Sequence, residues 1–225
     1  MPIQIETSTF KFLKNLRANN NRDWFTKNKP RYQTALENVK EVLDNIKNEV
    51  SHHDEVESHK LYRIYRDVRF SKDKTPYKSS FSAGFTRATK WKRGGMFISI
   101  SPGNSLAAGG FWNPDPKDLK RIRQEIAADD SHLRKLISKK GFKDYFGGLA
   151  GDQVKSAPKG YKKDHPAIDL LRYKQFLVYR HFTDKEVCSP TFAKEVSKTY
   201  KAMRPFFDYM SDVLTTDENG VRIEG

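Results

Sequence analysis

Basic side chains gather in one short stretch of the sequence. Residues 66–78 read "RDVRFSKDKTPYK" and set Arg and Lys side chains against the carboxylates of Asp67 and Asp73. A planar guanidinium binds carboxylate or phosphate through two parallel hydrogen bonds, and an ammonium adds a compact charge. The stretch therefore predicts an anion-binding surface. The candidate binding residues in and beside it are Arg63, Arg66, Arg69, Lys72, Lys74, Tyr77 and Lys78.

The charge of the whole chain is concentrated in the same region. The formal net charge is +14, and residues 60–93 alone hold eleven Lys and Arg against two Asp. A positive field of this kind attracts polyanions and speeds their capture, although it does not specify a fold. We therefore expect a phosphate-bearing ligand or a nucleic acid as the partner.

A second basic stretch surrounds an aromatic side chain. Residues 87–95 read "RATKWKRGG" and place Trp91 between cations. An exposed aromatic ring among basic residues suits a phosphate backbone with a stacked base, which makes Trp91 a further candidate binding residue. A cationic hairpin loop with Trp91 folded back on the core is an equally good interpretation.

A third stretch, "APKGYKKDHPAIDLL", contains side chains suited to proton transfer. A histidine with two carboxylates can act as a general base with its orienting group, or can hold a divalent ion. Asp164, His165 and Asp169 are therefore the candidate catalytic residues. A structural interpretation is simpler: Asp164 or His165 caps a short helix, and Asp169 pairs with Arg172 or Lys174.

Several familiar kinds of site are missing from the sequence. It contains no P-loop, no dinucleotide-binding glycine pattern, no nucleophile elbow, no HExxH and no paired CxxC. Cys188 is the only cysteine, which excludes an intrachain disulfide and a cysteine-based metal site. We expect no metal and no cofactor. Without a signal-peptide pattern or a membrane-length apolar run, we also expect a cytoplasmic protein that does not enter a membrane.

The elements that position these residues begin with helices in residues 1–60. Pro30 suits the first turn of a long helix, where its missing N–H costs nothing. Apolar residues then recur at alternating intervals of four and three, which predicts a helix with one face toward a core. These residues are Tyr32, Leu36, Val39, Leu43, Ile46 and Val50.

Strands and a hairpin are predicted for residues 61–113. Apolar and polar residues alternate over residues 61–70, as in a half-buried strand, and again over residues 79–88. Residues 94–112 read as a hairpin, with Pro and Gly at the centre of a turn over residues 101–104. The pair Gly109-Gly110 predicts a bulge or a close backbone approach.

Residues 114–225 predict helices and one returning strand. The strand is "QFLVYRHF", residues 175–182, followed by a capping box of Thr183 and Glu186. The last helix carries an apolar stripe from Phe192 to Leu214. This order of elements predicts one α+β domain over residues 1–225, with a mainly antiparallel central sheet and helices from both chain ends packed on one face.

Four blocks of the sequence resemble the signature blocks of a mostly bacterial family, the domain of unknown function 2461. The blocks are "NNNRDWF" (19–25), "RDVRFSKDKTPYK" (66–78), "GYKKDHPAIDLL" (160–171) and "AMRP" (202–205). The resemblance implies a single-domain cytoplasmic protein and assigns no activity. It marks, without roles, Arg66, Arg69, Lys72, Asp73, Lys74, Tyr77, Lys78, Asp164, His165 and Asp169. One departure is Phe111 before Trp112, where the family pattern has Leu.

These observations support three hypotheses. The favoured one is a binding module whose cations along one sheet edge hold a phosphate-bearing partner. The alternative is an enzyme for a small anionic substrate, with Arg66 as the anion clamp and His165 with Asp164 or Asp169 as acid–base groups. That alternative requires the 66–78 and 160–171 blocks to meet in one pocket. The third hypothesis is a structural or interaction protein whose charges only solvate its surface.

Overall fold

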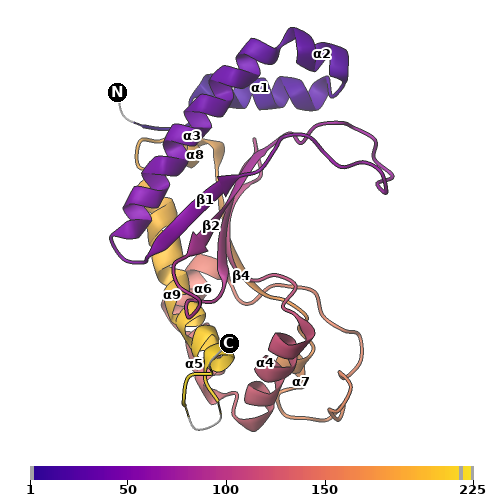
Figure 1. Ribbon diagram of the computed structural model, residues 1–225, viewed down its shortest axis with the longest axis vertical. Coiled ribbons are helices and arrows are strands. Elements are labelled where there is room, and N and C mark those ends of the chain that lie inside the picture. The colour runs from indigo at the N-terminus through magenta and orange to yellow at the C-terminus, as the bar shows by residue number, and fades with distance from the viewer. Residues whose placement is uncertain (1–2, 218–219, 224–225) are drawn as a thin grey trace. The chain divides into compact units, whose positions relative to one another are not determined.

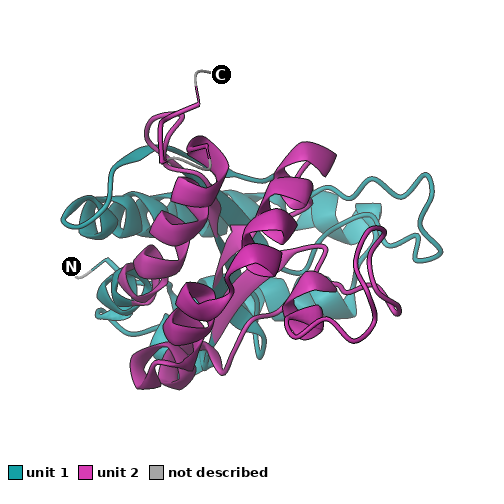
Figure 2. Cartoon of the chain, turned by 90° about the horizontal axis from the view of Figure 1, so that it is seen from below, with its two compact units in different colours: residues 1–86, 97–107, 181–198 teal, residues 87–96, 108–180, 199–225 magenta. Residues whose placement is uncertain are grey.

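The computed structural model describes residues 3–217 and 220–223, and the chain divides into two compact units (Figure 2). Unit 1 comprises residues 1–86, 97–107 and 181–198. Unit 2 comprises residues 87–96, 108–180 and 199–225. The boundaries fall inside strands and inside the last helix, so each unit is assembled from separate segments. That residues 1–225 fold as one domain stays a prediction.

The described residues form a five-stranded antiparallel sheet in the order β1-β2-β3-β4-β5 (Figure 1). The strands are β1 (Val56–Leu61), β2 (Phe81–Arg87), β3 (Gly95–Ile100), β4 (Ser105–Phe111) and β5 (Phe176–Phe182). The α+β class and the antiparallel sheet predicted from the sequence are thereby confirmed. The predicted hairpin is β3-β4, and its turn is closed by the Asn104 N–H, which donates to the Ser101 carbonyl at 2.9 Å.

The strand predicted over residues 61–70 is wrong. The first strand, β1, ends at Leu61, and residues 62–80 form a loop between β1 and β2. Ile64 is buried, but Phe70 is 97% exposed, so the alternation of apolar residues does not mark a buried face. The true strand, "VESHKL", is an edge strand with few apolar side chains. Its sequence therefore lacks the alternating pattern on which the prediction depended.

Unit 1 is built on helices from the N-terminal part of the chain. They are α1 (Thr7–Ala18), α2 (Arg22–Lys27) and α3 (Lys29–Ser51), with the short α8 (Asp184–Val187). Pro30 lies in the first turn of α3, as predicted. Val39, Leu43, Ile46 and Val50 are buried, which confirms the predicted stripe. The capping box of Thr183 and Glu186 is also confirmed at α8.

Unit 2 contains the remaining helices, which are α4 (Pro116–Ala128), α5 (Ser131–Ser138), α6 (Lys140–Phe146), α7 (Ile168–Leu171) and most of α9 (Phe192–Thr215). Helix α9 packs against β4 at Gly109, where an added Cβ would come within 2.6 Å of the Phe207 ring. Gly110 has a positive φ of 138°, and a Cβ there would collide with the Phe176 carbonyl oxygen. The predicted close backbone approach is therefore confirmed.

Candidate anion-binding sites

Residues 62–80, which we call the basic loop, leave β1 and return to β2 within unit 1 (Figure 1). The two arms pair where the Arg66 N–H donates to the Pro76 carbonyl at 2.9 Å and the Lys78 N–H to the Ile64 carbonyl at 2.8 Å. The Asn20 side-chain amide binds both main-chain groups of Tyr77, donating to its carbonyl at 2.8 Å and accepting from its N–H at 3.1 Å. The base of the loop is therefore anchored by the turn between α1 and α2.

Tyr77 anchors the basic loop because its side chain is buried. Its side chain is 6% exposed, and its ring stacks on Phe25 with centroids 4.0 Å apart. Tyr65 packs beside it at 5.3 Å. Burial raises the pKa of Tyr77. This candidate binding residue is thus a core residue of unit 1, and it offers little surface to a ligand.

The Arg66 guanidinium closes the basic loop on itself. It forms an ion pair with Asp73, donates to the Thr75 hydroxyl, and donates to the Thr75 carbonyl at 3.2 Å. The Thr75 N–H also donates to the Asp73 carboxylate at 2.9 Å. Chiefly through that N–H, and then through Arg66 and the Thr75 hydroxyl, the pKa of Asp73 is lowered to about 2. Arg66 therefore has an acidic partner, Asp73, within its own loop.

Two further cations of the basic loop are engaged within it. Arg69 binds Asp67 through two nitrogens, at 3.0 and 2.6 Å, and the side-chain hydrogen bond lowers the pKa of Asp67. The Lys74 ammonium donates to the Val68 carbonyl at 3.0 Å. The charge of Arg69 is therefore neutralised and the Lys74 ammonium is held in place, which the sequence alone did not show.

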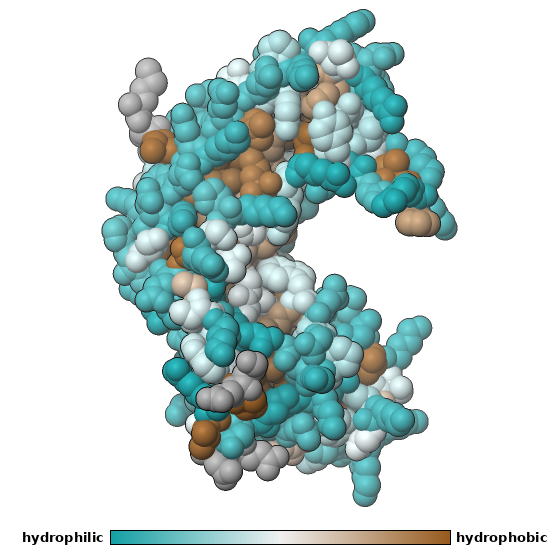
Figure 3. All heavy atoms as spheres, in the orientation of Figure 1, coloured by the Kyte–Doolittle hydropathy of each residue, from teal (hydrophilic) through white to brown (hydrophobic). Residues whose placement is uncertain are grey.

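The tip of the basic loop combines an exposed ring with cations. Phe70 is 97% exposed, and the Arg69 guanidinium lies 5.9 Å from its centroid. Arg63 and Lys72 are exposed and form no ion pair with any residue in the described part of the chain. Lys78 lies 6.0 Å from the ring of Tyr62. Figure 3 shows a mostly hydrophilic surface over this loop with an apolar spot at its end.

The arginines that flank Trp91 belong to unit 2 and have structural partners. The Arg87 side chain is fully buried and binds Asp208 at 3.0 Å. Arg93 pairs with Asp118. Each guanidinium is therefore held against a carboxylate of its own unit, and that of Arg87 is also inaccessible to a ligand.

Trp91 itself is half-buried beneath cations. The Lys90 ammonium lies 4.7 Å and the Arg222 guanidinium 5.0 Å from its ring centroid. The ring is therefore already engaged in cation–π contacts. Whether Trp91 binds a ligand stays a prediction.

Two of the three candidate catalytic residues also have local partners in unit 2. Arg134 binds both Asp169 oxygens, at 3.1 and 2.8 Å, and is the main reason that the pKa of Asp169 is lowered. The expected partners, Arg172 and Lys174, are not the ones that hold it. Asp169 therefore ties α7 to α5.

His165 and Asp164 precede α7. His165 accepts the Ala167 N–H at its Nδ1 atom at 3.1 Å, which places a ring proton on Nε2 when the imidazole is neutral. Asp164 is exposed and forms no ion pair within residues 3–217 and 220–223. Arg66 belongs to unit 1 and His165 to unit 2, and a pocket shared by the two blocks stays a prediction.

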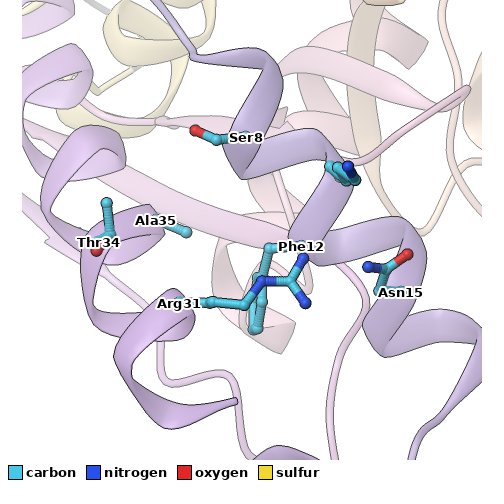
Figure 4. A pocket seen from close by; sticks show the side chains of 7 residues that line it. Ser8, Phe12, Asn15, Arg31, Thr34 and Ala35 are labelled. Atoms are coloured by element: carbon cyan, nitrogen blue, oxygen red, sulfur yellow. The ribbon is translucent and has the colours of Figure 1, made fainter.

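A hollow of about 430 Å³ lies between α1 and α3 in unit 1 (Figure 4). Figure 4 shows Arg31 extending from α3 toward α1, beside Phe12. The Arg31 guanidinium donates to the Asn28 side chain at 2.9 Å, and Lys11 adds a second cation. The lining residues are Ser8, Lys11, Phe12, Asn15, Arg31, Thr34 and Ala35. We call this the α1–α3 hollow.

A second hollow, of about 460 Å³, lies against α4 in unit 2. Arg123 is positioned there by two main-chain acceptors, the Leu171 carbonyl at 2.9 Å and the Tyr173 carbonyl at 3.1 Å. Its lining residues are Pro116, Leu119, Lys120, Arg123, Gln124, Lys159, Gly160 and Tyr161. We call this the α4 hollow. This hollow was not predicted from the sequence, although the i, i+3 spacing of Lys120 and Arg123 places two cations on one face of a helix.

Within residues 3–217 and 220–223, no group of three or more His, Cys, Asp or Glu side chains is placed to hold a metal ion. Over the same residues, none of the helices has the length and apolar character needed to cross a membrane.

Comparison with known proteins agrees with the sequence blocks. The family DUF2461, described as a conserved hypothetical protein, matches residues 8–209. The resemblance drawn from the four blocks is thereby confirmed. Neither a curated protein nor a solved structure matches the chain.

Proposed function

We propose that this chain, which belongs to the family DUF2461, is a binding module for single-stranded nucleic acid. The tip of the basic loop makes the contact. The observation that carries this proposal is the exposed ring of Phe70 among the cations of the loop. The setting we propose is the cytoplasm, where the lone Cys188 would stay reduced.

The exposure of Phe70 supports a ligand that covers the ring. Burying a Phe side chain is worth about 1.5–3 kcal/mol, which this chain forgoes at the loop tip. Stacking of a base on an aromatic ring contributes roughly 1–3 kcal/mol per base. A single strand fits better than a duplex, because its bases have faces that are free to stack.

The charges of the basic loop support a phosphate-bearing ligand. Six cations stand against two carboxylates in residues 62–80. Arg66 and Asp73 hold the loop closed, while Arg63 and Lys72 remain exposed and without an ion pair in the described chain. The internal pair thus gives the loop its shape, and the outer cations are free to contact phosphates.

The test is fluorescence anisotropy with a labelled oligo(dT) of about a dozen nucleotides, a length typical of such sites. We expect Phe70→Leu to weaken binding by roughly fivefold to 150-fold, because it keeps apolar surface but loses stacking. Phe70→Trp should retain binding. Lys72→Ala should reduce the log–log salt slope by about 0.7, the value for one phosphate of a single strand. The control Lys40→Ala, on an exposed position of α3, should leave the affinity unchanged.

Two outcomes would overturn the proposal. The first is the absence of oligo(dT) binding at low salt. The second is binding that Phe70→Leu leaves unchanged, since a stacking site cannot tolerate that substitution. If the protein binds anionic lipid vesicles and does not bind oligo(dT), it recognises a lipid surface and not nucleic acid.

A further inference from the structure

The α4 hollow carries positive charge that the protein does not neutralise. Lys120, Arg123 and Lys159 line it, and no carboxylate is among its lining residues in the described chain. None of the three cations forms an ion pair with a residue that the structure describes. Nearby arginines behave differently: Arg134, for example, binds two carboxylates.

Arg123 is held in place and still has unused donors. A guanidinium has five N–H donors, and the carbonyls of Leu171 and Tyr173 accept from two of its nitrogens. Burial lowers the pKa of Arg123, and its electrostatic interaction with Tyr161 offsets that effect only in part, so the charge is not fully compensated. A bound anion would supply that compensation and accept from the remaining donors.

The other polar groups of the hollow come from two separate segments. Lys120 lies one turn before Arg123 on α4, so the two side chains share a face of the helix. Lys159 and Tyr161 belong to the segment that precedes α7. Burial raises the pKa of Tyr161, so its hydroxyl stays protonated at neutral pH and is able to donate to an oxyanion.

The remaining lining of the hollow is partly apolar and has the size of a small-molecule site. Pro116 and Leu119 contribute nonpolar surface at the start of α4. Its volume of about 460 Å³ falls within the range of roughly 300–1,000 Å³ that is usual for ligand pockets.

From this geometry we infer that the α4 hollow binds a small phosphorylated molecule. Arg123, Lys120 and Lys159 hold the phosphate, Tyr161 donates to it, and the body of the ligand lies against Leu119. A phosphate dianion matches three cations better than a carboxylate monoanion does, because it leaves less charge uncompensated. The inference is independent of the proposed function, since no residue of the basic loop contributes to this hollow.

The first experiment is isothermal titration calorimetry of the full chain at constant ionic strength. The probes are inorganic phosphate, phenyl phosphate and benzoate. We expect saturable binding of phenyl phosphate, weaker binding of inorganic phosphate, and benzoate weakest of the three. Phenyl phosphate should also raise the thermal midpoint with concentration, because a ligand that binds only the folded state stabilises it.

The second experiment compares two matched double variants. Lys120→Ala/Lys159→Ala should weaken phenyl phosphate binding by roughly tenfold to hundredfold through the loss of charge-assisted hydrogen bonds. The control, Lys11→Ala/Arg31→Ala, removes the two cations of the α1–α3 hollow and should leave binding unchanged. Arg123→Lys keeps the charge but loses the planar fork, and it should weaken binding even where Arg123→Ala fails to fold.

The inference is overturned if phenyl phosphate does not bind saturably, or if Lys120→Ala/Lys159→Ala binds it as tightly as the wild type. It is also overturned if the control double variant loses as much affinity. Phe70→Leu should not change phenyl phosphate binding. A failure of oligo(dT) binding with intact phosphate binding would therefore reject the proposed function alone.

Discussion

Arg66 and Arg123 are both partly buried arginines, yet the protein uses them in opposite ways. Arg66, in the dense basic stretch, forms an ion pair with Asp73 of the same loop. Arg123, in a stretch where the sequence predicted no site, donates only to carbonyl oxygens among the described residues and has no carboxylate partner there. A main-chain carbonyl accepts a hydrogen bond but does not neutralise a cation. The local density of Arg and Lys is therefore a poor guide to where free positive charge lies.

The largest difference between the two regions should appear in Tyr77 and Tyr161. Tyr77 is buried and stacks on Phe25, so Tyr77→Ala should lower the free energy of unfolding by roughly 3–5 kcal/mol, as for other large-to-small aromatic substitutions. Tyr161 is half-exposed at the α4 hollow, so Tyr161→Ala should cost about 1 kcal/mol. Urea unfolding of each variant measures both values. Equal losses would show that Tyr77 is not the anchor of the basic loop.

Removing Arg123 or Arg66 should change stability less than Tyr77→Ala does. The loss should be global for Arg123 and local to the basic loop for Arg66. Arg123→Ala leaves the Leu171 and Tyr173 carbonyls without their donor, which should lower the free energy of unfolding by roughly 1–3 kcal/mol. Arg66→Ala should change global stability less, but it should open the basic loop and speed chymotrypsin cleavage after Phe70. Cleavage at the wild-type rate would mean that the Arg66–Asp73 pair does not keep the loop closed.

The smallest effects are expected in the pKa values of Asp73 and Asp169. The N–H of Thr75 is the main cause of the low pKa of Asp73, so Arg66→Ala should restore only part of the normal value. Arg134 is the main cause at Asp169, so Arg134→Ala should restore more of it. Carboxyl NMR titrations of the two variants measure both changes, and a full return to normal in Arg66→Ala would contradict the order of causes at Asp73.

The low pKa of Asp73 makes the stability of the basic loop depend on pH with a definite sign. The pKa of Asp73 is about 2 in the folded state, below its usual value of about 3.9. The stabilisation by its carboxylate is therefore complete above about pH 4 and is lost as the pH falls through about 2. Faster hydrogen exchange of the Thr75 amide below pH 4, after correction for intrinsic rates, would report that loss.

The elements with strong apolar periodicity were predictable. The stripe of α9 from Phe192 to Leu214 and that of α3 both face the core, because burial of one helix face imposes a repeat that survives in any sequence context. The β3-β4 hairpin was likewise set by its turn residues. Strand β1 was not predictable, because an edge strand buries little and leaves no apolar alternation to detect.

The residue composition of the candidate sites was predictable from the sequence, but which of their charges are neutralised was not. That residues 60–93 are strongly basic follows from the sequence. That Arg87 binds a carboxylate does not follow from it, because Asp208 lies 121 positions from Arg87 along the chain and 3.0 Å from it in space.

By itself, the sequence determined the net charge, the apolar faces of the long helices, the hairpin turn and the positions that need glycine, because each depends on residue type or on spacing along the chain. The tertiary structure alone decided which cations are neutralised, that Phe70 is exposed while Tyr77 is buried, and that Lys120, Arg123 and Lys159 line one hollow. The physical reason is that charge compensation and burial act over a few ångströms in space, and separation along the chain does not record such distances.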